Sequence, residues 1–326
     1  MKNSFGSSVC VTLFGESHGS AVGAVVDGLA PGLPVKNENI ERLLARRRPS
    51  GLTDTARRES DRFEILSGVF GGRTTGTPLC IVIPNENTRS GDYQYGAARP
   101  SHADYAAFCK YHGFEDYRGG GHFSGRVTAA LVAVGGILLP ALESLGITVG
   151  THILSCGGVN DRDFDDIGAD IALLGGKTFP VLDDERGREM AERILKAREA
   201  LDSVGGVTQT AVCGVPGGVG EPWFDSVEGL LSHALFSLGG VKGIEFGLGF
   251  GFADRPTPSI AREQQTVDFI KNENTPINIK GRHDPAIIRR ICPVIDSVTA
   301  IVLCDLLAQR FGTDSLVKGV PSCFTD

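Results

Sequence analysis

The sequence predicts a globular protein of the mixed α/β or α+β class. Apolar and polar residues alternate over 9–13, and a second strand-like run follows at 21–26. Longer apolar or amphipathic segments at 37–48, 127–145 and 183–204 are typical of helices. Because these elements do not follow the strict βαβ rhythm of a dinucleotide-binding domain, a Rossmann fold is not predicted.

The remaining elements follow in order along the chain. Pro49 ends the first helix, and Pro140 is expected to bend or break the helix over 127–145. The inward-facing positions of the helix over 183–204 are expected to be Met190, Ile194, Leu195 and Leu201. Further strands are predicted at 63–69, 79–83, 147–154 and 207–215, and further helices at 226–238, from about 286 and at 298–311. Similar glycine-rich turns in both halves indicate a possible internal duplication within one domain over 1–326.

Composition limits the possible classes of function. The chain has 326 residues, 41% of them apolar, and a net charge of −7, which argues against a general nucleic-acid or membrane-surface binder. Its 44 glycines are about 13% of the residues against a norm of about 7%, so many turns or close approaches are expected. The eight cysteines contain no C-x-x-C pair and are interpreted as reduced core thiols, with no metal site. No secretory signal or long apolar span is visible, so a cytoplasmic location is expected.

Residues 14–19 form the first candidate site, because an apolar strand breaks there into glycines and side chains able to carry protons. The segment reads Phe-Gly-Glu-Ser-His-Gly, which places His18 in a tight turn between two strands. It also fits Gly-x-Ser-x-Gly, the elbow that carries the nucleophilic serine of α/β-hydrolases. A strand rather than a helix is predicted to follow, so a serine hydrolase using Ser17 is the weaker alternative.

Arginines and glycines elsewhere could hold an anion. The basic cluster contains Arg42, Arg46, Arg47, Arg48, Arg57 and Arg58. Guanidinium groups suit carboxylates and phosphates, but a solvated helix face explains the cluster equally well. The glycine-rich loop 118–126 precedes a helix N-terminus, where free N–H groups favour an anion. A tight turn without a ligand is the alternative, and the flanking arginines favour the anion.

Two further segments hold titratable groups at predicted helix starts. Ser101 is expected to cap a helix whose first turn contains His102, with Asp104 close to a capping-box position. The cluster at 282–285, Arg-His-Asp-Pro, is either a helix cap or a functional group of residues. A non-catalytic anion-binding module would explain the arginines but would leave His18, His102 and Asp284 without a task.

Seven segments together resemble the chorismate synthase family, in the family's order and over nearly the whole chain. They are Gly15-Glu16-Ser17-His18-Gly19, Arg47-Arg48-Pro49, Arg99-Pro100-Ser101-His102-Ala103-Asp104-Tyr105, Arg118-Gly119-Gly120-Gly121, Asp202-Ser203-Val204-Gly205-Gly206, Val241-Lys242-Gly243-Ile244-Glu245-Phe246-Gly247 and Arg282-His283-Asp284-Pro285. Chance does not produce seven such matches.

The resemblance implies an anti-1,4-elimination of phosphate from 5-enolpyruvylshikimate-3-phosphate to give chorismate, in aromatic amino acid biosynthesis. Reduced FMN would be the cofactor, with NADPH as its direct or indirect reductant. The fold implied is a β-α-β sandwich with central helices between antiparallel sheets, assembled as a homotetramer. An external flavin reductase is expected, because no reductase domain is visible in the sequence.

The resemblance also implies roles for individual residues. His18 and His102 would be the catalytic histidines, one protonating the leaving phosphate and the other the reduced flavin, while Asp284 would accept the substrate proton through the flavin. The substrate-binding residues would be Arg48, Arg57, Arg99, Ser124, Arg126 and Arg282. The cofactor-binding residues would be His122, Phe123, Ser124, Gly239, Gly240, Arg255, Pro256, Thr257, Pro258, Ser259 and Arg282.

The sequence departs from the family at three places. Residues 122–128 read His-Phe-Ser-Gly-Arg-Val-Thr where Arg-Ser-Ser-Ala-Arg-Glu-Thr is common, and Asp296 stands where glutamate is usual. Between Gly247 and Arg255 the family normally has several dozen residues that cover the flavin, whereas only 248–254 stand here. Either the chain lacks part of its flavin site, or the printed sequence joins the flanks of a mobile loop. We favour the second, because both flanks keep the family register.

Peptide mass mapping of the natural protein across 243–262 tests this interpretation. We expect a peptide heavier than the printed sequence allows, because the flavin-covering segment would lie within it. A peptide of the printed mass would show instead that the segment is missing, and would put the activity in doubt.

Overall fold

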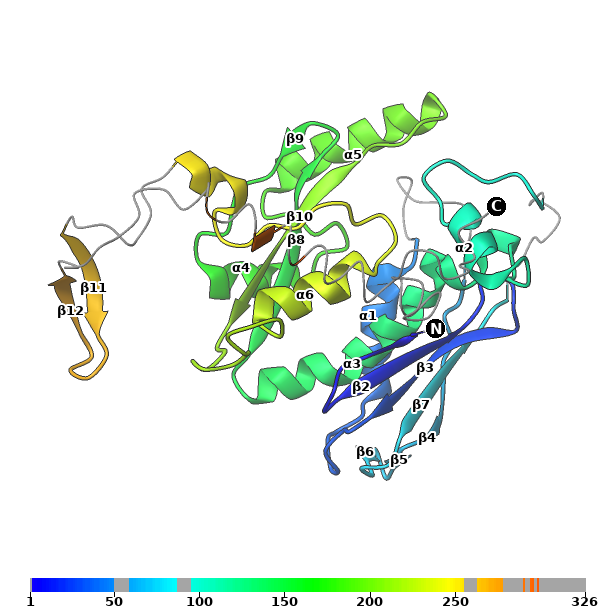
Figure 1. Ribbon diagram of the computed structural model, residues 1–326, viewed down its shortest axis with the longest axis horizontal. Helices are drawn as coiled ribbons and strands as arrows, with labels where there is room; N and C mark the ends of the chain where they lie inside the picture. Colours follow the sequence, from blue (N-terminus) through cyan, green and yellow to red (C-terminus); the bar gives the residue numbers. More distant parts are fainter. Residues whose placement is uncertain are drawn as a thin grey trace, which may run out of the picture. The chain divides into compact units, whose positions relative to one another are not determined.

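The computed structural model describes residues 2–49, 59–86, 95–254 and 263–277, together with positions 290, 294, 295 and 298. Helices and sheets are mixed, and every strand pairing in these described residues is antiparallel (Figure 1). This confirms the predicted α+β class. The chain divides into two compact units, Met1–Ile244 and Glu245–Asp326, and a single domain over the whole chain stays a prediction.

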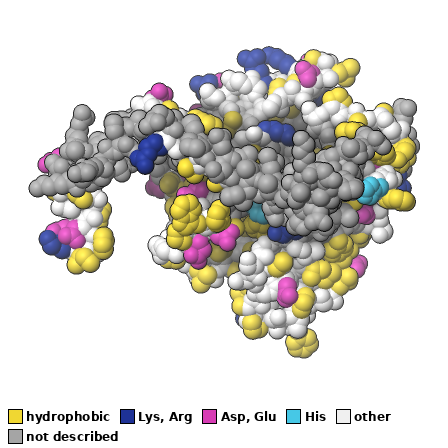
Figure 2. All heavy atoms as spheres, in the orientation of Figure 1, with side chains coloured by type: hydrophobic (Ala, Val, Ile, Leu, Met, Phe, Trp, Pro, Cys, Tyr) yellow, Lys and Arg dark blue, Asp and Glu magenta, His cyan; other side chains and the backbone are white. Residues whose placement is uncertain are grey.

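The first sheet of the larger unit has five strands in the order β1-β2-β3-β7-β4. Their bounds are β1 Ser4–Phe5, β2 Cys10–Gly15, β3 Ala21–Asp27, β7 Leu79–Pro84 and β4 Glu64–Ser67. Two short strands, β5 (Val69–Phe70) and β6 (Arg73–Thr74), form a separate ribbon. In Figure 2 hydrophobic side chains show at the surface over this ribbon, and Phe70 is 84% exposed.

One face of the first sheet forms the main core with helices α1 (Asn37–Arg47) and α3 (Thr128–Ser144). Strand periodicity explains this face, because alternate residues of β3 and β7 point the same way. The fully buried members are Val22, Ala24 and Val26 of β3 and Leu79, Ile81 and Ile83 of β7. Ile40 and Leu44 of α1 complete it, on the stripe that the sequence predicts.

Helix α3 is long and apolar because it is a core helix. Of the described helices, the stretch Gly125–Ser144 is the one with the length and hydropathy to cross a membrane. It packs on α1 and on strands β3 and β7, and its first half buries Ala129, Ala130 and Ala133 completely. The helix continues through Pro140, so the break expected there does not occur.

A second sheet in the same unit has the order β10-β8-β9, with helices α4 and α5 beside it. The bounds are β8 Thr148–Cys156, β9 Val159–Asn160, β10 Gly206–Cys213, α4 Ile167–Leu174, α5 Asp184–Glu199 and α6 Val227–Phe236. Met190 of α5 is fully buried, as expected. The prediction for Leu201 is wrong: α5 ends before it, its φ is 56°, and the side chain is 97% exposed.

The smaller unit contains the short helix η4 (Gly249–Asp254) and a hairpin of β11 (Gln264–Asp268) and β12 (Glu273–Ile277). The helices predicted from about 286 and at 298–311 fall almost wholly outside the described residues. The described cysteines, at positions 10, 80, 109, 156 and 213, are thiols outside any disulfide, as predicted. Cys109 is exposed, however, so it is not a core thiol.

The contact between α1 and α3 predicts a sharp difference between two neighbouring glycines. A Cβ at Gly136 would lie 2.6 Å from Cα of Ile40, whereas a Cβ at Gly135 would meet a movable methyl carbon of Leu43 at 3.2 Å. We expect Gly136→Ala to lower the free energy of unfolding by about 1–3 kcal/mol, because backbone must shift. Gly135→Ala, the matched control, should be neutral or up to about 1 kcal/mol stabilising through helix propensity. Urea unfolding measures both, and equal effects would contradict the close approach.

Candidate active site

His18 lies in the turn between β2 and β3, as the sequence predicts. It is 8% exposed, and the neighbouring Ser17 is fully buried. The Ser17 N–H donates to the carbonyl of Gly121 at 3.0 Å, and the Gly19 N–H donates to that of Glu16 at 3.1 Å. Because a strand follows this turn and the Ser17 hydroxyl is buried, the geometry of a hydrolase nucleophile elbow is absent here.

A run of three glycines, Gly119–Gly121, passes directly beside His18. Their φ angles are 60°, 81° and 52°, a region that favours glycine. A Cβ at Gly119 would lie 2.7 Å from Nε2 of His18, and a Cβ at Gly120 would lie 3.3 Å from a terminal guanidinium nitrogen of Arg99. The absence of side chains therefore allows this segment to run between His18 and Arg99, which the fold brings together.

Arg99 is held by the carboxylate of Asp104, five residues later in the chain. Its Nε and Nη2 donate to the two oxygens of Asp104 at 2.9 and 2.8 Å, and its backbone N–H donates to the same group at 2.9 Å. These hydrogen bonds lower the pKa of Asp104 from 3.8 to about 2, so the pair is ionised at neutral pH. Arg99 thus presents a guanidinium whose charge is largely balanced.

His102 lies on the loop before helix α2 (Asp104–Tyr111) and not in its first turn. The N-cap is Ala103, and Ser101 has a φ of 61°, so the expected Ser101 cap is wrong. Asp104 explains the difference, because it bonds to Arg99 and fixes the backbone ahead of the helix. His102 is exposed, and its Nδ1 lies 3.0 Å from the carbonyl of Pro100.

Arg126 is 5% exposed and anchored within the protein. Its Nε donates to Oδ1 of Asn85 at 2.8 Å, its Nη2 donates to the carbonyl of Pro84 at 3.0 Å, and its Nη1 pairs with Asp61. The same carboxylate lies 3.6 Å from Nη1 of Arg47. Neither Asp61 nor Asn85 lies in one of the seven family-like segments, so sequence reasoning missed both. The signal available for Asn85 is that it is the first polar residue after the strand predicted at 79–83.

The loop that leads into α3 holds the other predicted residues. Ser124 accepts a hydrogen bond from the Arg126 N–H at 3.2 Å, which starts the short helix η3 (Gly125–Val127). Nδ1 of His122 lies 2.7 Å from the carbonyl of Gly15, so this loop contacts the end of β2. Before it, Asp116 and Arg118 form a bidentate pair at 2.7 Å, which lowers the pKa of the Asp116 carboxyl.

Not every predicted residue is brought to this cluster. Arg48, at the end of α1, donates from Nη1 to the carbonyl of Ser60 at 2.8 Å. Gly239 and Gly240 follow helix α6, and Gly240 has a φ of 95°. Outside the described residues lie Arg57, Arg255, Pro256, Thr257, Pro258, Ser259, Arg282 and Asp284.

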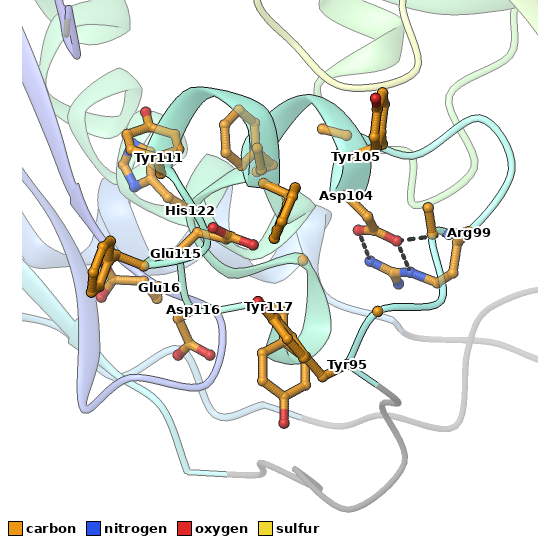
Figure 3. A pocket seen from close by; sticks show the side chains of 18 of the residues that line it. Glu16, Tyr95, Arg99, Asp104, Tyr105, Tyr111, Glu115, Asp116, Tyr117 and His122 are labelled. Carbon is orange, nitrogen blue, oxygen red and sulfur yellow. Dashed lines mark hydrogen bonds and ion pairs between the residues drawn. The ribbon is translucent and has the colours of Figure 1, made fainter. Parts of the chain in front are cut away.

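A cavity of about 850 Å³ lies against this cluster, between the end of β2, helix α2 and the short helix η2 (Arg118–Phe123) (Figure 3). Its tyrosine and phenylalanine lining consists, among the described residues, of Phe14, Tyr95, Tyr105, Phe108, Tyr111, Phe114, Tyr117 and Phe123. Figure 3 shows Arg99 and Asp104 facing each other at one side and His122 at the other. Glu115 is one of the lining residues, and its Oε2 is buried without a hydrogen-bond partner within the protein.

Comparisons with known proteins agree on one family. The sequence pattern of the family described as chorismate synthase matches residues 9–256 and again 251–308. A chorismate synthase of Syntrophus aciditrophicus is 40% identical over 350 residues, covering 94% of this chain and 98% of the relative. One from Thermococcus kodakarensis is 37% identical over 359 residues, covering 96% and 99%.

A solved structure supports the same assignment. A crystal structure of chorismate synthase has a TM-score of 0.64 and 28% identity, covering 83% of this chain and 78% of that one. The family pattern and both relatives extend over nearly the full length of the chain. The chain therefore belongs to the chorismate synthase family.

Proposed function

We propose that this protein converts 5-enolpyruvylshikimate-3-phosphate into chorismate and phosphate, with the help of reduced FMN. The observation that carries the proposal is the full-length match to curated chorismate synthases. In this chain, the family-like residues His18, Arg99 and Ser124 lie around one glycine segment. In this elimination the substrate ring loses one proton and one phosphate group, and the electrons of the C–H bond form the new double bond.

The residues of this cluster suit proton transfer beside an anion. His18 is nearly buried, and the backbone of Gly119 packs directly against its ring, which fixes the position of the ring. A histidine changes its proton state near neutral pH, which suits it to donate to the leaving phosphate. We assign the second histidine role to His102 and proton acceptance to Asp284, and the binding of the substrate's carboxylates and phosphate to Arg48, Arg57 and Arg282.

The aromatic cavity fits the ring of a flavin. Its walls include eight tyrosine and phenylalanine side chains, and the expected contacts His122 and Phe123 are among the lining residues. When bound, reduced flavin supplies electron density that eases cleavage of the bond to phosphate. The protein would orient the ring, exclude water and hold the titrating groups in place.

Assembly, location and flavin supply complete the proposal. A homotetramer is supported by helix α6, where Val227, Leu230 and Leu231 are about two-fifths exposed and no residue of the helix is buried. We further propose that the enzyme works in the cytoplasm and receives flavin reduced by NADPH through a separate reductase. The alternative function is that of a non-catalytic anion-binding relative. Only a measurement of chorismate formation distinguishes the two.

Anaerobic incubation with the substrate and chemically reduced FMN tests the reaction. We expect chorismate absorbance and inorganic phosphate to rise in equal amounts, because each turnover releases one of each. Omitting the flavin is the control and should abolish both signals. If folded protein yields neither product with flavin present, the proposed reaction is wrong.

Variants of the proposed proton-transfer groups test the assigned roles. His102→Ala and Asp284→Ala should lower kcat by about 10²- to 10⁴-fold, as expected for loss of a general acid or base. Substrate affinity, measured by equilibrium binding, should stay close to that of the wild type because the arginines remain. His112→Asn is the matched control, since His112 is an exposed C-cap of α2, and it should turn over normally. A near-normal rate in His102→Ala or Asp284→Ala would remove that residue from the mechanism.

A further inference from the structure

Asn85 lies where the register of two strands brings it to the turn that holds His18. Strands β3 and β7 pair with Ala21 opposite Pro84. The Asn85 N–H continues this ladder by donating to the carbonyl of Ser20 at 3.0 Å. The side chain of Asn85 therefore starts from a fixed backbone position at the base of the β2–β3 turn.

The Asn85 amide bridges this turn to Arg126. Its Nδ2 donates to the carbonyls of Glu16 and Gly19, each at 2.9 Å, and its Oδ1 accepts from Nε of Arg126 at 2.8 Å. A guanidinium can only donate and a carbonyl can only accept, so these partners determine the orientation of the amide. The two carbonyls stand on either side of His18 in the chain, and both ends of its turn are held by one side chain.

Arg126, at the other end of this bridge, is itself held in place by a buried ion pair. The Arg126 side chain is 4% exposed and the Asp61 side chain is fully buried, and the two form an ion pair. Arg126 also donates to the carbonyl of Pro84 at 3.0 Å, and Asp61 lies 3.6 Å from Nη1 of Arg47. Removing one member of a buried ion pair is strongly unfavourable, so Arg126 cannot move to follow a displaced turn.

We propose that Asn85 is a positioning residue that holds His18 at a fixed place relative to Arg126 and the glycine segment. It supplies one acceptor to a buried arginine and two donors to the turn, a combination that only a side-chain amide offers at this length. The inference rests on the proposed function, because the reaction of His18 is proposed there. The Asn85 side chain makes no contact with the reacting atoms in this role.

The isosteric variant Asn85→Asp tests the bridge. It keeps an acceptor for Arg126 but places an oxygen against the carbonyls of Glu16 and Gly19, so the turn should open. We expect kcat to fall by about 10- to 100-fold, the range expected for a displacement of about 1 Å at a reacting group. KM should change less than kcat, because Arg126 keeps an acceptor in the aspartate variant and none of the arginines assigned to substrate binding is substituted. Asn85→Ala should behave in the same way, and the aspartate variant decides if the alanine variant fails to fold.

Amide hydrogen exchange of peptides spanning 16–20 gives a readout that does not depend on activity. Both Asn85 variants should exchange faster there, because the Ser17 and Gly19 N–H bonds depend on the closed turn, while the urea midpoint stays near that of the wild type. Asn160→Asp, a change of an exposed asparagine of β9, is the matched control and should change neither measurement.

Normal kcat in Asn85→Asp, or slow turnover with unchanged exchange at 16–20, would overturn the inference. If the wild type makes no chorismate, the proposed function fails, and the exchange result still decides whether Asn85 holds the turn.

Discussion

The buried carboxylate of Asp61 is the constraint on which the described site depends. It pairs with Arg126, at the entry to α3, and with Arg47, at the end of α1. Arg47 in turn donates to the carbonyl of Gly125 at 2.8 Å and to Oγ1 of Thr128 at 3.1 Å. Because a lone charge in this position would cost several kcal/mol, of order 3–5, both arginines stay with it. The loop before α3 is thereby joined to α1 through charge as well as packing.

Much of the fold could be predicted from the sequence because it follows from local periodicity. The alternation in β3 and β7, the stripe on α1 and the apolar run of α3 all appear where the pattern places them. Failures occur where a distant or unusual contact overrides the local signal. Ser101 does not cap α2 because Asp104 binds Arg99, and Leu201 lies beyond the end of α5 in a left-handed conformation.

The candidate site was only partly visible in the sequence for the same reason. Motifs identify His18, Arg99 and Ser124, but they do not show that one stretch of glycines separates the first two. Asn85 and Asp61 could not be selected from sequence alone, since their importance comes from strand register and from burial. The family pattern matches in two parts that overlap at 251–256, and the interpretation that a flavin-covering segment belongs between Gly247 and Arg255 stays a prediction.

The lining of the aromatic cavity also has an electrostatic consequence. Among the described residues, the carboxylates of Glu16, Asp104, Glu115 and Asp116 line this hollow. Asp104 is matched by Arg99, and Asp116 is matched by Arg118. The described lining therefore carries more negative than positive charge, which is unfavourable for a substrate with two carboxylates and a phosphate because like charges repel. An uncharged ring gains from burial in the same space without meeting this repulsion. The charge of the described lining thus favours an uncharged ring over an anionic group at this place.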